Sequence, residues 1–162
     1  MQSKNLIACG IALAGTMFAT VARSEAQSTP LDAVKMFEKV FNAGDNTKAA
    51  DLSSSGGMAI VDEFGQHLWI GKSAFATWGA DYDKDAKSKG ITEPFVSFAV
   101  PLVSSVNGDM AYVVCPAVYT YKLKGVPMRE TARMAMVLHK EDGVWRFTSQ
   151  AWAGTKPKVV RK

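Results

Sequence analysis

The sequence predicts an α+β domain in which three N-terminal helices pack on one face of a strongly curved, mainly antiparallel sheet. Two observations lead to this prediction. In the first half of the chain, apolar residues recur at helical spacing, interrupted by one short hairpin. In the second half, four long segments with alternating apolar residues are separated by turn residues. This order of elements places the helices together as one layer against the sheet.

The first predicted helix begins at Thr29-Pro30 and ends at Gly44. Threonine can cap the first free N–H groups, proline suits the first helical position, and glycine suits the left-handed cap. Residues 45–52 are predicted to form a short second helix, and residues 71–89 a third. The third helix has an apolar side that carries Phe75, Trp78 and Tyr82.

The rest of the chain is predicted to be strands and turns. A small hairpin is expected at 58–62 and 67–70, followed by long strands at 95–106, 110–123, 128–140 and 144–153. Asn107-Gly108 is a strong hairpin signal, and Pro101 and Pro116 predict edges or bulges. On strand 128–140, alternation places Glu130 on the same face as the methionines, but it does not decide which face is concave.

The N-terminal segment has the pattern of a secretory signal peptide. Lys4 precedes an uncharged, apolar or small run over residues 6–22, and Ser24 and Ala26 are small residues at a cleavage site. We therefore expect residues 1–26 to be a signal peptide cleaved after Ala26. The expected location is secreted or periplasmic, with no stable membrane anchor.

The net charge of +4 on 162 residues is concentrated at the ends of the chain. Residues 27–155, the predicted domain, carry 13 Lys and Arg against 14 Asp and Glu, and residues 156–162 form a basic C-terminal tail. We expect this tail to be solvated and mobile. The nearly neutral domain and the predicted export both argue against a nucleic-acid partner.

Three local motifs resemble the NTF2-like superfamily, which includes SnoaL-like, DUF4440-like and ketosteroid-isomerase-like proteins. The motifs are Phe41-Asn42-Ala43-Gly44-Asp45, the pair of segments 60–65 and 71–75, and Gly143–Phe147 with Gln150-Ala151-Trp152. The resemblance covers about residues 29–154. It implies a cone-shaped fold with a pocket between sheet and helices, and often a homodimer formed through the sheet.

The resemblance does not extend to the isomerase machinery. In steroid-isomerase-like members an aspartate after the first strand shuttles the proton, and Asp62 matches that motif position. The position of the family's tyrosine falls on Phe37, and that of its late-strand aspartate falls near Met134–Met136, where there is no carboxyl group. Because the groups that stabilise the enolate are missing, we expect no isomerase activity of that type.

The candidate site residues follow from the same motifs and from the aromatic content. Asp62 and His67 flank the small hairpin and could form an acid–base pair. The alternative, which the pattern favours, is that Asp62 caps or stabilises the turn and His67 is a half-exposed strand residue. The expected ligand-binding residues are aromatic: Trp69, Phe75, Trp78, Tyr82, Tyr119 and Trp152. His67 and His139 lack further ligands at suitable spacing, so we expect no metal site and no cofactor.

Three functions are compatible with these residues. The first is an exported domain that binds a small, mostly apolar molecule in its cone. The second is a SnoaL-like enzyme of the isomerase, cyclase or dehydratase type that uses Asp62 and His67. The third is a homodimeric interaction module with no ligand. An open cavity beside Asp62 would favour the first two.

Overall fold

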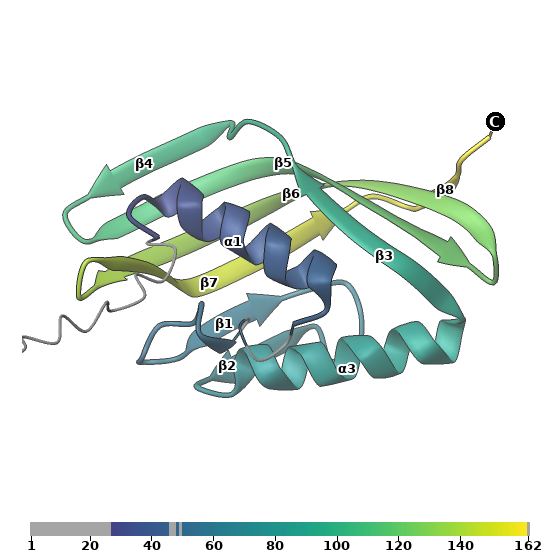
Figure 1. The fold of residues 1–162 in the computed structure, drawn as a ribbon, viewed down its shortest axis with the longest axis horizontal. Coiled ribbons are helices and arrows are strands. Elements are labelled where there is room, and N and C mark those ends of the chain that lie inside the picture. Colours follow the sequence, from purple (N-terminus) through teal and green to yellow (C-terminus); the bar gives the residue numbers. More distant parts are fainter. Residues whose placement is uncertain (1–26, 46–47, 49, 162) are drawn as a thin grey trace, which may run out of the picture.

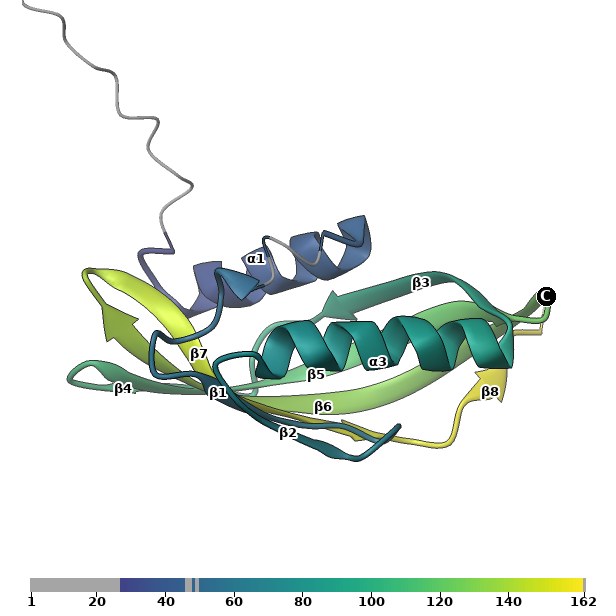
Figure 2. The ribbon, with the colours of Figure 1, turned by 90° about the horizontal axis from the view of Figure 1, so that it is seen from below.

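The computed structural model describes residues 27–45, 48 and 50–161. Two helices and eight strands are named in this part of the chain: α1 (Pro30–Ala43), β1 (Met58–Val61), β2 (Leu68–Gly71), α3 (Ala74–Lys89), β3 (Ile91–Phe98), β4 (Val103–Asn107), β5 (Met110–Leu123), β6 (Val126–Glu141), β7 (Val144–Gly154) and β8 (Lys158–Val159). Figures 1 and 2 show both helices on one side of a curved sheet. The predicted α+β class is confirmed.

The sheet is mixed, with strand order β2-β1-β7-β6-β5-β3. β4 also pairs with β5, and β8 pairs with β6. β1 runs parallel to β7, whereas the other named pairs are antiparallel. The parallel pair brings the small β1–β2 hairpin beside the last long strand, and so carries Asp62 to the concave side of the sheet.

The ends of α1 have the predicted chemistry. Thr29 Oγ1 accepts a hydrogen bond from the N–H of Asp32, and the Asp32 carboxylate accepts from the Thr29 N–H, which completes a capping box. Gly44 ends the helix with φ of 65°, the left-handed conformation that glycine adopts without steric cost. α1 packs on β3, β5 and β7, and α3 packs on β1, β2 and β3.

The structure shows which face of β6 is buried. Ala132, Met134, Met136 and Leu138 are buried, and so is Glu130, whereas Arg133 on the opposite face is exposed. The methionine face of β6 is therefore the concave face beneath the helices. Burial of its side chains against α1, β1 and β7 forms the hydrophobic core.

Several elements differ from their predicted form. The predicted strand 95–106 is two strands, β3 and β4, and Pro101, which has no backbone N–H to donate to a neighbouring strand, lies between them. In the basic tail, Lys158–Val159 pairs with Met128–Arg129 of β6 and is not a free end. The predicted second helix at 45–52 includes residues 46, 47 and 49, which lie outside the described residues, so two of the three predicted helices are seen.

The predicted signal peptide, residues 1–26, also lies outside the described residues. In the part of the chain that the structure describes, no helix is both long and apolar enough to cross a membrane.

Candidate functional site

A cavity of about 440 Å³ lies between the helices and the concave face of the sheet. Its walls come from α1, α3, the β1–β2 turn, β3, β5, β6, β7 and the segment that follows β7. Most of its large side chains are aromatic, and we call them the aromatic wall: Phe37, Phe41, Phe64, Trp78, Tyr82, Tyr119, Tyr121 and Trp152. A cavity of this size, largely apolar with a few polar groups, is typical of small-molecule sites.

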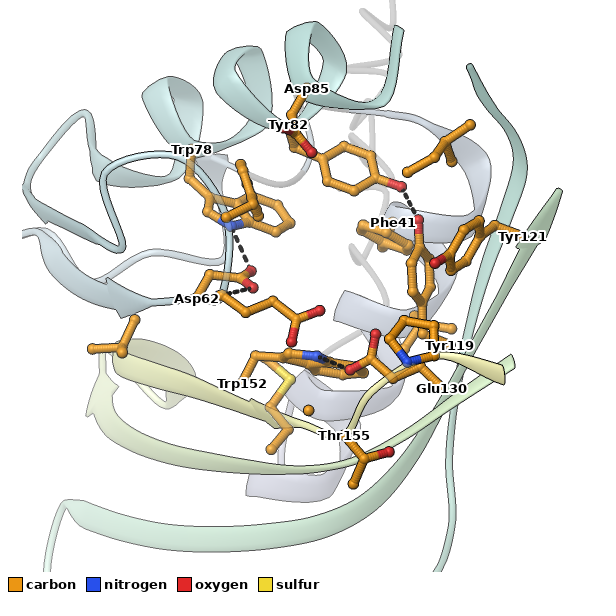
Figure 3. A pocket seen from close by; sticks show the side chains of 18 of the residues that line it. Phe41, Asp62, Trp78, Tyr82, Asp85, Tyr119, Tyr121, Glu130, Trp152 and Thr155 are labelled. Carbon is orange, nitrogen blue, oxygen red and sulfur yellow. Dashed lines mark hydrogen bonds between the residues drawn. The ribbon is translucent and has the colours of Figure 1, made fainter. Parts of the chain in front are cut away.

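Local structure explains why these rings converge. Trp78 and Tyr82 are one helical turn apart on α3, and their rings stack with centroids 5.8 Å apart. Tyr119 and Tyr121 alternate onto one face of β5, with ring centroids 4.9 Å apart. The hydroxyls of Tyr82 and Tyr119 lie 2.6 Å apart and share a hydrogen bond across the cavity (Figure 3).

Asp62 extends the alternation of β1, in which Met58 and Ile60 are buried on the concave side. Its carboxylate accepts a hydrogen bond from Trp78 Nε1 at 2.9 Å and another from the Glu63 N–H at 2.7 Å. Burial raises the pKa of Asp62, although both hydrogen bonds act in the opposite direction. Asp62 is therefore a carboxyl group whose proton affinity is increased by its position in the cavity.

Glu130 is a second carboxyl group in the cavity. It lies opposite Tyr119 in the pairing of β5 with β6, is 1% exposed, and accepts a hydrogen bond from Trp152 Nε1 at 3.0 Å. Burial raises its pKa to about 7, and hydrogen bonding with Glu63 and the nearby charge of Asp62 act in the same direction. Figure 3 shows Asp62 and Glu130 at the edge of the space between the rings.

Gly154 permits the close approach of the carboxyl groups that we call the acidic cluster: Asp62, Glu63 and Glu130. A Cβ at position 154 would lie 2.6 Å from Glu63 Oε2 and 2.9 Å from Trp152 Nε1, closer than real Cβ atoms come. The glycine leaves this space free. Glu63 is exposed at the mouth of the cavity, whereas Glu130 is buried.

The structure brings only some of the predicted site residues together. Asp62, Trp78, Tyr82, Tyr119 and Trp152 line the cavity. Phe37, the position where the resemblance would require a tyrosine, also lines it and has no hydrogen-bonding group.

His67, Trp69 and Phe75 do not line the cavity. His67 is exposed in a turn with φ of 65°, and its Nδ1 contacts the backbone oxygen of Asp62 at 3.1 Å. Among the described residues, no hydrogen bond joins the two side chains. Trp69 is buried and donates to Asp81 at 2.8 Å, and Phe75 is buried in the core beside Phe37.

Three lining residues that were not candidates in the sequence contribute polar groups: Glu63, Glu130 and Gln150. The sequence did contain a signal for Glu130: it shares a strand face with several methionines, and a charged residue on such an apolar face is unusual. In the described part of the chain, no group of three His, Cys, Asp or Glu side chains is arranged to hold a metal ion.

Comparison with known proteins adds the family and the fold. The model of the SnoaL-like domain family matches residues 31–151. A search of curated proteins found no match to this sequence.

Solved structures with the same fold are similar to this chain at low identity. One is a protein from Novosphingobium aromaticivorans described as a candidate scytalone dehydratase, with TM-score 0.64, 10% identity, and 80% of this chain and 84% of that chain covered. An NTF2-like protein with a cystatin-like fold from the same organism has TM-score 0.60, 16% identity, and coverage of 77% and 79%. A type 2 hexachlorocyclohexane dehydrochlorinase, LinA, has TM-score 0.67, 11% identity, and coverage of 81% and 86%. At these identities the likeness shows the fold, which is NTF2-like.

Proposed function

This chain belongs to the SnoaL-like domain family, and from that premise we propose that it binds a small, mostly apolar molecule in the cavity between its helices and its sheet. The observation that carries the proposal is the open cavity of about 440 Å³ beside Asp62, lined by eight aromatic side chains. We propose further that the protein is exported, with residues 1–26 removed after Ala26. The measured mass of the exported protein tests this part, because retention of residues 1–26 would contradict it.

A thermal-shift screen with small apolar compounds tests the binding proposal. Phe41→Trp enlarges a ring of the cavity wall and should abolish the ligand-induced rise in Tm. Phe98→Trp is the matched control, since Phe98 is also half-buried and also packs against Phe37 but does not line the cavity. Equal ligand shifts in the two variants would contradict binding in this cavity.

A second candidate function is acid–base catalysis of the dehydratase type. The observation that favours it is the presence of two cavity carboxyl groups with raised pKa, Asp62 and Glu130. In an elimination, ionised Asp62 would remove a proton from carbon, the new C=C bond would form as the C–O bond breaks, and protonated Glu130 would protonate the departing hydroxyl to give water. Glu130 would thus take the role that the sequence assigned to His67.

The catalytic candidate is tested by turnover of candidate hydroxylated substrates by the wild type and three variants. Asp62→Asn and Glu130→Gln should each lower the rate by a factor of about 10² or more. His67→Ala should leave the rate nearly unchanged, since His67 lies outside the cavity lining. Loss of activity in His67→Ala alone would support the Asp62–His67 pair instead.

We also propose a homodimer formed through the outer face of the sheet. Large apolar side chains are exposed on the strands, among them Leu68 at 48%, Ile70 at 71% and Tyr112 at 46%. Light scattering of the purified protein tests this, and Ile70→Asp should shift a dimer toward monomer. A wild-type monomer at micromolar concentration would refute it.

A further inference from the structure

We propose that the cavity selects a small organic ammonium ion, a molecule with an apolar body and a protonated amine, over a neutral or anionic molecule of the same shape. This inference rests on the proposed binding function and names its ligand class. Three independent features carry it: an acidic cluster with no paired cation, a wall of ring faces, and an unpartnered buried oxygen.

Within the described residues, no basic side chain forms an ion pair or a hydrogen bond with a carboxylate of the acidic cluster, although the charge of His67 acts to lower the pKa of Asp62. The protein groups that donate to Asp62 and Glu130 from outside the cluster are neutral, namely two indole N–H groups and one backbone N–H, and within the cluster Glu63 and Glu130 share a hydrogen bond. None of the ion pairs found within the described ranges includes a carboxylate of the cluster. When they ionise, carboxyl groups held together without a paired cation produce a negative potential in the cavity, which attracts a positive ligand.

The basic residues near the cavity do not neutralise the cluster. Lys89 lines the cavity but pairs with Asp85 at 2.7 Å, one helical turn away on α3. Lys156 is exposed on the segment that follows β7. The lining therefore contains four carboxyl groups against two ammonium groups, one of which is already paired.

The aromatic wall provides a second attraction for a cation. Ring faces carry partial negative charge, and an ammonium group over a tryptophan or tyrosine face is stabilised by it. Trp78 and Tyr82 stack on one side of the cavity, and Tyr119 and Tyr121 stack on another (Figure 3). A cation between these pairs can contact ring faces while its substituents contact apolar carbon.

Gln150 gives the third, independent feature. It lines the cavity, is 4% exposed, and its Oε1 is buried without a hydrogen-bond partner in the described structure. A buried acceptor without a partner is costly, and a ligand N–H group would satisfy it. A carboxylate ligand would instead place a second acceptor against it. The unpartnered oxygen therefore favours a ligand that donates hydrogen bonds, as an ammonium group does.

The binding of an ammonium ion should depend on pH in a definite direction. The pKa of Glu130 is raised to about 7, so this group is mainly protonated at pH 6 and mainly ionised at pH 8. The groups lining the same cavity are Asp62 and Glu63 from the β1–β2 turn, Tyr82, Asp85 and Lys89 from α3, Tyr119 and Tyr121 from β5, and Lys156 after β7. Because a cation favours the ionised carboxylate, affinity should rise from pH 6 to pH 8 with release of a proton on binding.

Three probes that share one skeleton test the inference by calorimetry: 2-phenylethylamine, which is protonated at these pH values, the neutral 2-phenylethanol, and the anionic 2-phenylacetate. At pH 8 we expect the amine to bind at least about tenfold more tightly than the alcohol, as expected for hydrogen bonds to charged groups. The acetate should bind most weakly. Only the amine should gain affinity between pH 6 and pH 8.

Variants assign the preference to the cluster. Glu130→Gln should remove most of the advantage of the amine over the alcohol, together with its pH dependence. Glu63→Gln, at an exposed position, should reduce the advantage and serves as the test if Glu130→Gln does not fold. Glu93→Gln removes an exposed glutamate outside the cavity lining and should change nothing.

Two outcomes would overturn the inference. If the alcohol binds as tightly as the amine, the cation preference is refuted while the proposed binding of apolar molecules stands. If none of the three probes binds at millimolar concentration, the cation preference is also refuted. The Phe41→Trp and Phe98→Trp pair then decides separately whether the cavity binds small molecules at all.

Discussion

Replacing Glu130 by glutamine should stabilise the protein, and only at high pH. Glutamine is nearly isosteric, can still accept the hydrogen bond from Trp152 Nε1, and has no charge to bury. The native pKa of Glu130 is raised from 4.5 to about 7. Between these values the folded protein holds a proton that the unfolded chain has lost, so the free energy of unfolding falls as pH rises through this window.

The size of the effect follows from the same pKa values. At about 1.4 kcal/mol for each pH unit, the rise in pKa corresponds to a loss of up to about 3 kcal/mol of stability above pH 7. Glu130→Gln should therefore match the wild type within about 1 kcal/mol at pH 5 and exceed it by up to about 3 kcal/mol at pH 8. The raised pKa of Asp62 acts in the same direction in both proteins and largely cancels in the difference.

Urea unfolding followed by circular dichroism, at pH 5, 6, 7 and 8, measures this difference. Glu93→Gln is the control, since Glu93 is 67% exposed and pairs with Lys122 at the surface. Its difference from the wild type should stay near zero throughout. If the curves for Glu130→Gln and the wild type run parallel from pH 5 to pH 8, Glu130 does not titrate as a buried carboxyl and the reasoning fails.

The other predictions concern Glu141, whose effect on stability has the opposite pH dependence, the glycine beside the acidic cluster, and the core. Hydrogen bonds, the strongest from the Ser54 hydroxyl, lower the pKa of Glu141 to about 2. The ionised carboxylate therefore stabilises the fold above pH 4.5, and this contribution is lost as pH falls toward 2. In urea unfolding, Glu141→Gln should lower the free energy of unfolding by about 2 kcal/mol at pH 7 and by little at pH 2.5. Gly154→Ala should keep its circular dichroism spectrum but lose the ligand-induced thermal shift, because a Cβ would lie 2.6 Å from Glu63 Oε2; an unchanged shift would remove Gly154 from the site. Phe37→Ala, at a core position 4% exposed, should cost about 3 to 5 kcal/mol in the same unfolding assay, and a loss below 1 kcal/mol would contradict its place in the core.

The strands were predictable because their signals are local. The segment 110–123 matches β5, since the Asn107-Gly108 turn fixes its start and alternation runs through it. Local sequence did not determine which face of each strand is the concave one. Alternation places Glu130 with Met134 and Met136, but only packing against α1 and β7 makes that face concave.

The candidate site was predicted in part for the same reason. Asp62 and Trp78 belong to elements whose inward faces are set by local pattern, and their side chains meet at 2.9 Å. His67 is close to Asp62 in sequence, but a left-handed turn directs its contact to the backbone of Asp62. Glu130 is 68 positions from Asp62 along the sequence, and its approach depends on the register of β6 with β5 and β7.

Glu130 connects the stability of this fold with its proposed ligand. A carboxyl group on the methionine face of β6 departs from the apolar pattern of that face. Its charge should lower the stability of the protein at neutral pH, whereas an uncharged glutamine should not. A purely structural role predicts that Glu130→Gln raises stability and leaves binding unchanged. A role in binding an ammonium ion predicts that the same substitution raises stability and removes the amine's advantage. The two measurements on one variant therefore separate a tolerated defect of the core from a group that serves the cavity.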